Sequence, residues 1–246
     1  MIFAINSEKS VFGVPNASMI STMWDWFNSK LPEDGSVRIK DLSSETSIIA
    51  LQGPESVSIL RDVLGEENNV SRFSCQNIAK NNLHITGWIQ GTGYTGERGV
   101  EIFIPNSQAS ILWNSLINSG AIPVGLGARD TLRLEKGYLL SGQDFLWPGL
   151  DIQPDIQMPE GFLFRNSVET NIPFGLNLDH EFIGKEPLIK SLNSGSRWLG
   201  LVCQERGPNP RPGHMVFDGP GDSAKKVGYV TSCLLYTSDA ADELCR

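Results

Sequence analysis

The sequence contains few of the residues that crosslink small proteins or bind metals. Its 246 residues include four cysteines and three histidines, and these show neither Cys-x-x-Cys spacing nor a cysteine and histidine at ligand spacing. This pattern predicts free thiols of a reducing compartment rather than a disulfide framework, and no metal site. The thiols concerned are Cys75, Cys203, Cys233 and Cys245.

Long apolar runs and an excess of positive charge are also missing. No apolar stretch reaches the roughly 18 residues that span a membrane. A signal peptide begins with a basic segment before its apolar residues, and no such segment precedes the first apolar residues here. The net charge is -8, whereas nucleic-acid-binding proteins usually carry a basic surface. We therefore expect no membrane partner, no nucleic-acid partner and a cytoplasmic location, or a mitochondrial one after loss of a transit peptide.

The apolar residues that are present alternate between strand spacing and helical spacing. Strand spacing predicts strands at residues 2–5, 11–14, 37–42, 47–51, 83–89, 100–104 and 198–203. Helical spacing predicts helices at residues 108–119 and 126–136, each followed by a glycine that ends it. Strands and helices mix without strict alternation, which predicts an α+β fold.

Composition changes along the chain predict three parts. Residues 1–194 form the main domain, and a short-stranded region rich in glycine and proline indicates the start of a β-type domain at residues 195–232. Residues 233–246 are similar to a translated sequencing adapter, which makes them a non-native tail. The alternative is a genuine acidic tail.

A glycine-rich segment, Gly-Thr-Gly-Tyr-Thr-Gly at residues 91–96, matches the pattern of a dinucleotide-binding loop. That use requires a helix to follow the last glycine, so that its N-terminus faces the pyrophosphate. Here an apolar strand pattern follows instead. We therefore reject dinucleotide binding and expect a tight turn that brings the backbone close to another group.

Two sets of charged residues need an explanation. Glu101 lies within an apolar strand pattern and shares one strand face with Phe103, so it is either a binding carboxylate or a residue at a solvated edge. Arg129 and Arg133 lie one helical turn apart. They either bind an anionic group or pair with Asp130 and Glu135, and spacing alone favours the pairing.

Several motifs together resemble the glycine cleavage T-protein family of aminomethyltransferases. They are Ile-Ala-Leu-Gln-Gly-Pro at 49–54, Thr-Gly-Tyr-Thr-Gly-Glu at 92–97, Gly-Val-Glu-Ile at 99–102, Gly-Leu-Gly-Ala-Arg-Asp-Thr-Leu-Arg-Leu-Glu at 125–135 and Phe-Ile-Gly-Lys-Glu at 182–186. Their order and rough spacing match over residues 1–232. The chain is thus identified as a fragment of such a protein, truncated at both ends.

The resemblance implies a T-protein-like fold of folate-binding lobes followed by a C-terminal β-barrel domain. It implies tetrahydrofolate as the cofactor and lipoylated H-protein as the partner that delivers an aminomethyl group. It also implies that Glu101 hydrogen-bonds the pterin ring and that Arg129 binds folate. Asn16, Tyr94 and Tyr138 match further positions of the same folate site.

The family's catalytic aspartate has no counterpart in this sequence. Counting back from Asn16, that aspartate falls just before Met1, so Met1 is expected to be an internal codon. No catalytic residue is therefore predicted within the chain. As written, the chain is expected to bind folate weakly and not to catalyse.

One segment departs from the family pattern and leaves the one-carbon donor open. Residues 145–173 carry an aromatic insertion where T-proteins have a shorter link. Alternatives are therefore a folate-dependent demethylase, or a dimethylglycine- or sarcosine-type one-carbon transferase. A non-catalytic folate-binding protein of iron–sulfur cluster repair is a third, but the cysteine of its Lys-Gly-Cys-Tyr motif is absent from Lys-Gly-Tyr at residues 136–138.

Overall fold

The computed structural model of the chain describes most of its length and divides it into two compact units. The first unit is Met1–Arg129 and the second is Asp130–Arg246, so the division falls within helix α4 (Leu126–Glu135). The described residues are 2–146, 158–170, 176–193, 195–204 and 207–233.

A four-stranded antiparallel sheet is the framework of the first unit. Its strands are β3 (Thr46–Gln52), β4 (Cys75–Asn77), β5 (Trp88–Gln90) and β6 (Gly99–Pro105), in the order β3-β6-β5-β4. Apolar residues alternate along β3 and β6, and side chains alternate between the two faces of a strand. The register therefore sorts the side chains into two different faces.

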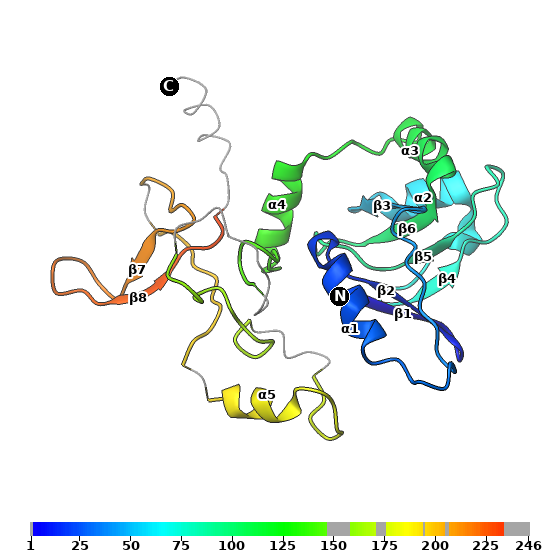
Figure 1. Cartoon of the computed structure of the whole chain (residues 1–246). Helices are drawn as coiled ribbons and strands as arrows, with labels where there is room; N and C mark the ends of the chain where they lie inside the picture. The colour runs from blue at the N-terminus through cyan, green and yellow to red at the C-terminus, as the bar shows by residue number, and fades with distance from the viewer. Residues whose placement is uncertain (1, 147–157, 171–175, 194, 205–206, 234–246) are drawn as a thin grey trace. The chain divides into compact units, whose positions relative to one another are not determined.

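One face of the sheet is apolar and packs against two helices (Figure 1). The helices are α2 (Ser56–Leu64) and α3 (Ala109–Asn118). Their buried leucines and isoleucines form one cluster with strand residues that all point to this side: Ile49, Leu51, Ile89, Val100, Ile102 and Ile104. Burial of this apolar surface is the main stabilising contribution to the first unit.

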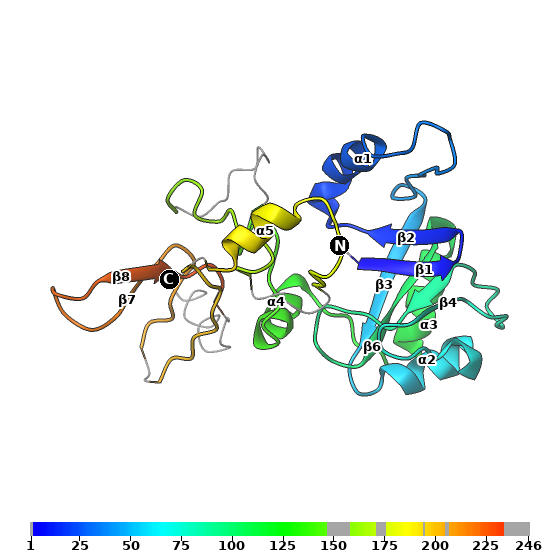
Figure 2. The same ribbon diagram turned by 90° about the horizontal axis from the view of Figure 1, so that it is seen from below.

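The opposite face is partly covered by a hairpin of β1 (Ile2–Ser7) and β2 (Ser10–Val14). Figure 2 shows the hairpin running across the direction of β3. Phe12 of the hairpin lies edge-on to the rings of Trp88 and Phe103, which stack on each other with centroids 4.8 Å apart. At the β3 edge this face stays open, since Ile48 and Ala50 are exposed.

The hairpin leads into a short 3-10 turn and a helix, and further 3-10 turns flank the two helices that cover the sheet. After β2 come η1 (Ala17–Met19) and α1 (Ile20–Asn28), while η2 (Glu66–Asn68) follows α2 and η3 (Asn106–Gln108) precedes α3. The second unit holds most of α4 together with α5 (Lys185–Ser191) and a β7–β8 hairpin (Met215–Phe217 and Lys226–Tyr229).

The predicted α+β class is confirmed, and two predicted strands are wrong. Residues 37–42 form no strand, because Asp34 and Asp41 accept hydrogen bonds from the Ser36 and Ser43 amides and turn the chain on both sides. Hydrogen bonds from the Ser36 and Ser43 side chains, followed by those from their amides, lower the pKa of the two aspartates below the ordinary value. Residues 198–203 also form no strand.

Three further expectations concern membrane spans, free thiols and the domain boundary. No helix in the described ranges is long and apolar enough to cross a membrane. Cys75 and Cys203 are free thiols, as expected. The domain boundary near residue 195 stays a prediction, and the proposed tail lies outside the described residues apart from Cys233.

Candidate functional site

The glycine-rich segment folds as a tight loop around the side chain of Gln52, at the end of β3. The Gln52 amide nitrogen donates to the carbonyl oxygens of Thr92, at 3.1 Å, and Val100, at 3.0 Å. Its amide oxygen accepts a hydrogen bond from the Thr95 hydroxyl at 3.1 Å. One side chain therefore joins β3, the loop and β6.

Glycine is required in this loop because the backbone passes so close to its neighbours. A Cβ atom at Gly93 or Gly99 would overlap the side-chain amide of Gln52, and one at Gly91 would overlap the backbone of Ser71. The loop is followed by strand β6 and not by a helix. The rejection of dinucleotide binding and the expectation of close backbone approach are both consistent with this geometry.

Glu101 lies on the open face of the sheet, where this loop folds back. It is half-buried, its neighbours across the sheet are Ala50 on β3 and Gln90 on β5, and the Thr92 hydroxyl donates a hydrogen bond to its Oε2. Phe103 lies two residues further along the same face, as the strand pattern predicted. A half-buried carboxylate beside the exposed residue Ala50 can accept hydrogen bonds from a flat ligand.

The structure also brings together two other predicted residues, Tyr94 and Arg129. The guanidinium of Arg129 lies 4.5 Å from the centroid of the Tyr94 ring, within the range of a cation–π interaction. Arg129 is exposed, so its charge is accessible to an anion from solvent. Tyr94 belongs to the glycine-rich loop whose Thr92 contacts Glu101.

The other two predicted residues, Asn16 and Tyr138, form their described hydrogen bonds with partners other than Glu101. Asn16 is exposed and precedes the η1 turn, where its carbonyl oxygen accepts a hydrogen bond from Met19 at 2.9 Å. Tyr138 belongs to the second unit, where its backbone exchanges hydrogen bonds with Arg133. Their part in a folate site stays a prediction.

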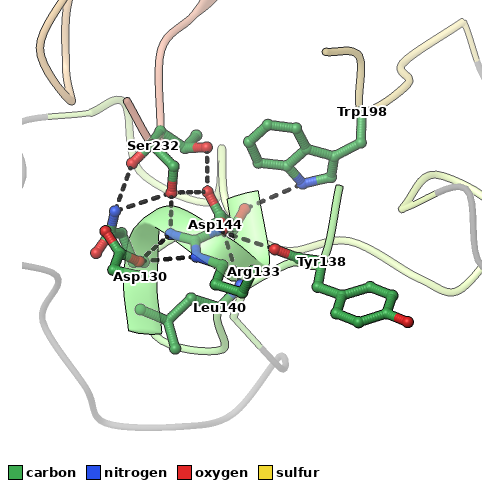
Figure 3. Close-up of polar contacts among 9 residues, drawn as sticks. Asp130, Arg133, Tyr138, Leu140, Asp144, Trp198 and Ser232 are labelled. Atoms are coloured by element: carbon green, nitrogen blue, oxygen red, sulfur yellow. Dashed lines mark hydrogen bonds and ion pairs between the residues drawn. The ribbon is translucent and has the colours of Figure 1, made fainter. Parts of the chain in front are cut away.

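Arg133 is held in a buried polar network rather than in an anion site (Figure 3). Its side chain is 1% exposed and forms ion pairs with Asp144 at 2.6 Å and with Asp130 at 2.7 Å. It also donates to the carbonyl oxygen of Tyr138 and to the hydroxyl of Ser232. The predicted pairing with Asp130 is confirmed, and Asp144 is a partner that spacing did not reveal.

The Asp144 carboxylate is also fully hydrogen-bonded. Its Oδ2 accepts from Arg133 and from the backbone amide of Leu140, and its Oδ1 accepts from the hydroxyls of Thr231 and Ser232. Four donors fill the acceptor positions of one carboxylate. The network therefore ties the end of α4 to the segment after β8, and its role is structural.

Part of the aromatic insertion also packs within the second unit. Phe162 lies edge-on to Tyr229 of β8 with ring centroids 4.8 Å apart, and the Arg165 guanidinium lies over the Phe162 ring. Leu146 bonds to the backbone of Leu163, and both leucines are buried. Residues 147–157, with Trp147, lie outside the described residues.

Sequence reasoning missed the residues that build the site around Glu101. Gln52 belongs to the Ile-Ala-Leu-Gln-Gly-Pro motif at residues 49–54, but nothing in its spacing shows that its side chain bonds to the glycine-rich loop. Gln90 carried a signal that was overlooked, because it is a polar residue between an apolar strand pattern and the first glycine.

Comparison with known protein families assigns the chain. The profile described as the GCVT N-terminal domain matches residues 1–147, more than half of the chain, and includes Glu101, Tyr94 and Arg129. The chain belongs to the GCVT family. The resemblance drawn from its motifs is confirmed.

The chain is similar to proteins named as aminomethyltransferases. It is 33% identical over 226 residues to the enzyme of Prosthecochloris aestuarii, covering 89% of this chain and 57% of that protein. It is 34% identical over 236 residues to the enzyme of Bacillus mycoides, covering 92% and 57%. The chain thus spans about half the length of the curated relatives it matches.

A solved structure supports the fold of the chain. The crystal structure of glycine cleavage system aminomethyltransferase T from Bartonella henselae matches with a TM-score of 0.58 and 28% sequence identity. The match covers 76% of this chain and 47% of that one. The predicted T-protein-like fold is confirmed to that extent.

Proposed function

We propose that the protein to which this chain belongs is a tetrahydrofolate-dependent aminomethyltransferase of the glycine cleavage system. In this reaction an aminomethyl group arrives on the lipoyl arm of the H-protein. Its methylene carbon passes to tetrahydrofolate, and ammonia is released. The proposal rests on the family and on one structural observation, the carboxylate of Glu101 on the open face of the sheet.

Glu101 suits the ring of tetrahydrofolate because of what that ring offers. The 2-amino group and N3 of the pterin present two parallel N–H donors, and a carboxylate can accept both. Hydrogen bonds to a charged group are worth about 1.5–3 kcal/mol each. Thr92 already donates to Oε2, which orients the carboxylate before a ligand arrives.

Arg129 suits the opposite end of the same ligand. Folate ends in a glutamate tail with carboxylates, and Arg129 is an exposed cation. The Tyr94 ring contacts one flat side of the Arg129 guanidinium. The N–H groups at the edge of the guanidinium can then donate two parallel hydrogen bonds to one carboxylate. The ring end and the tail end of folate would thus each meet a residue of the first unit.

Positioning is what these residues would contribute to the transfer. A reaction between two bound groups gains most of its rate from holding them in the correct geometry. The exposed β3 edge of the face, at Ala50, gives the ring a flat surface beside Glu101.

The test is a titration of the chain with tetrahydrofolate by calorimetry, kept anaerobic to protect the ligand. Glu101→Gln should raise the Kd at least tenfold, since the change replaces one of the two side-by-side acceptor oxygens with an NH2 donor that faces an N–H of the ring. Glu97→Gln is the matched control, because Glu97 is an exposed carboxylate in the same loop, and it should leave the Kd unchanged. An unchanged Kd for Glu101→Gln would remove Glu101 from the site.

A further inference from the structure

Gln90 is a buried polar side chain whose amide has no partner among the described residues. It is 2% exposed, and neither its Nε2 nor its Oε1 makes a hydrogen bond there. The Nε1 of Trp88, two residues earlier on the same face of β5, is also buried without a partner. Buried polar groups in native proteins nearly always have partners, so each exception needs an explanation.

The position of Gln90 in the sheet points toward the ligand site. Gln90 lies directly opposite Glu101 in the β5–β6 pair, so both side chains rise from the same face. On the far side of Glu101 is Ala50, which is exposed. A flat ligand entering over Ala50 would meet Glu101 first and then Gln90, where the hairpin begins to cover the sheet.

A carboxamide offers what a carboxylate cannot, which is a donor next to an acceptor. The reduced pterin ring carries a complementary pair beside the edge that Glu101 would bind. Its 4-oxo oxygen is an acceptor, and the neighbouring N5–H of the tetrahydro form is a donor. The two buried atoms of Gln90 could satisfy both groups at once.

We propose that the Gln90 carboxamide binds the O4/N5–H edge of the tetrahydropterin ring, with Nε2 donating to O4 and Oε1 accepting from N5–H. This inference rests on the proposed function, because it assigns Gln90 to the ring that Glu101 anchors. Oxidised folic acid has no hydrogen on N5, so that nitrogen is an acceptor there. Gln90 therefore makes the site prefer the reduced ligand over the oxidised one.

Two ligands and three variants test this assignment. The Kd values of tetrahydrofolate and folic acid are measured anaerobically by calorimetry for the unmodified chain, Gln90→Met and Gln90→Leu, which keep the volume but remove the amide. Gln76→Met is the control, because Gln76 on β4 faces the other side of the sheet and bonds to the Glu67 carbonyl. A melting curve without ligand shows that each variant is folded.

The expected result is unequal weakening. Gln90→Met should raise the Kd of tetrahydrofolate about tenfold, equivalent to about 1.4 kcal/mol, and that of folic acid about threefold or less. Gln76→Met should change neither. Folded Gln90 variants with unchanged Kd values, or with both values raised equally, would overturn the assignment.

Failure of the proposed function would look different. If the unmodified chain binds neither ligand, folate is not its ligand, and both the proposed function and the role of Gln90 are overturned. If the chain binds tetrahydrofolate and Glu101→Gln weakens binding while Gln90→Met does not, the function stands and only the role of Gln90 is overturned.

Discussion

Arg133 and Asp144 are two opposite charges that the second unit buries almost completely. Burying charges costs several kcal/mol per ion unless hydrogen bonds compensate, and here each carries a full set of partners. Asp144→Ala should lower the free energy of unfolding by about 3–5 kcal/mol, because it leaves the Arg133 guanidinium buried without its main partner. Urea unfolding measures this change.

The control for that variant is Asp130→Ala. Asp130 pairs with the same arginine, but its side chain is 37% exposed, and exposed ion pairs contribute about 1 kcal/mol or less. Equal losses for the two variants would contradict the view that Asp144 is the anchor of the network.

Gly93 tests the close packing of the glycine-rich loop. A Cβ atom at this position would overlap the Gln52 amide, so Gly93→Ala should destabilise the chain by about 1–3 kcal/mol through overpacking. Gly127→Ala is the contrasting variant, because it lies in α4 with no atom within 4 Å of the added carbon. That change should stabilise by about 0.5–1 kcal/mol, as thermal melting would show.

The position of a single residue could be predicted from the sequence where it depends on the geometry of one strand or one helix. The strand face that Glu101 shares with Phe103 followed from alternation alone, and the Arg133–Asp130 pair followed from helical spacing. The pattern marks Gln90 as an unusual polar residue, but neither its position beside Glu101 nor the contacts of Gln52 could be predicted, because both depend on which strands become neighbours.

Among the elements, the long and strongly periodic segments were predicted best. Strands β3 and β6 and helices α3 and α4 fall within two residues of their predicted limits. The strand predicted at residues 83–89 shrank to β5 at its end. At the start of the predicted strand, the Asn81 side chain forms two hydrogen bonds with the backbone of Ile85, and His84 has a positive φ of 54°. The chain therefore turns at these residues and joins the sheet only from Trp88 onward.

Helix α3 offers a direct test of which face carries the core. Leu112 is fully buried in the apolar cluster, whereas its neighbour Ile111 is 50% exposed. Leu112→Ala should cost about 2–5 kcal/mol in unfolding free energy, as for other large-to-small core changes. Ile111→Ala should cost less than about 1 kcal/mol, and similar values for both would contradict the assigned faces.

At the scale of the whole molecule, the two units have different means of stabilisation. The apolar cluster lies wholly within the first unit, and the Arg133–Asp144 network lies wholly within the second. Cores that share no residues open locally with separate free energies. The sequence indicated more than one domain, but composition could not show that the division falls inside a helix.

Hydrogen exchange can test this separation. Leu112→Ala should raise amide exchange in β3 and β6 more than in β7 and β8, whereas Asp144→Ala should do the reverse. Uniform acceleration in both variants would instead indicate one cooperative unit.

The central claim is that the open sheet face of the first unit holds the ring of tetrahydrofolate at Glu101. The most direct measurement is a structure of the chain with tetrahydrofolate bound. The account predicts the 2-amino and N3 groups within hydrogen-bond distance of the Glu101 carboxylate, with the glutamate tail toward Arg129. A bound ring that contacts neither residue would contradict it.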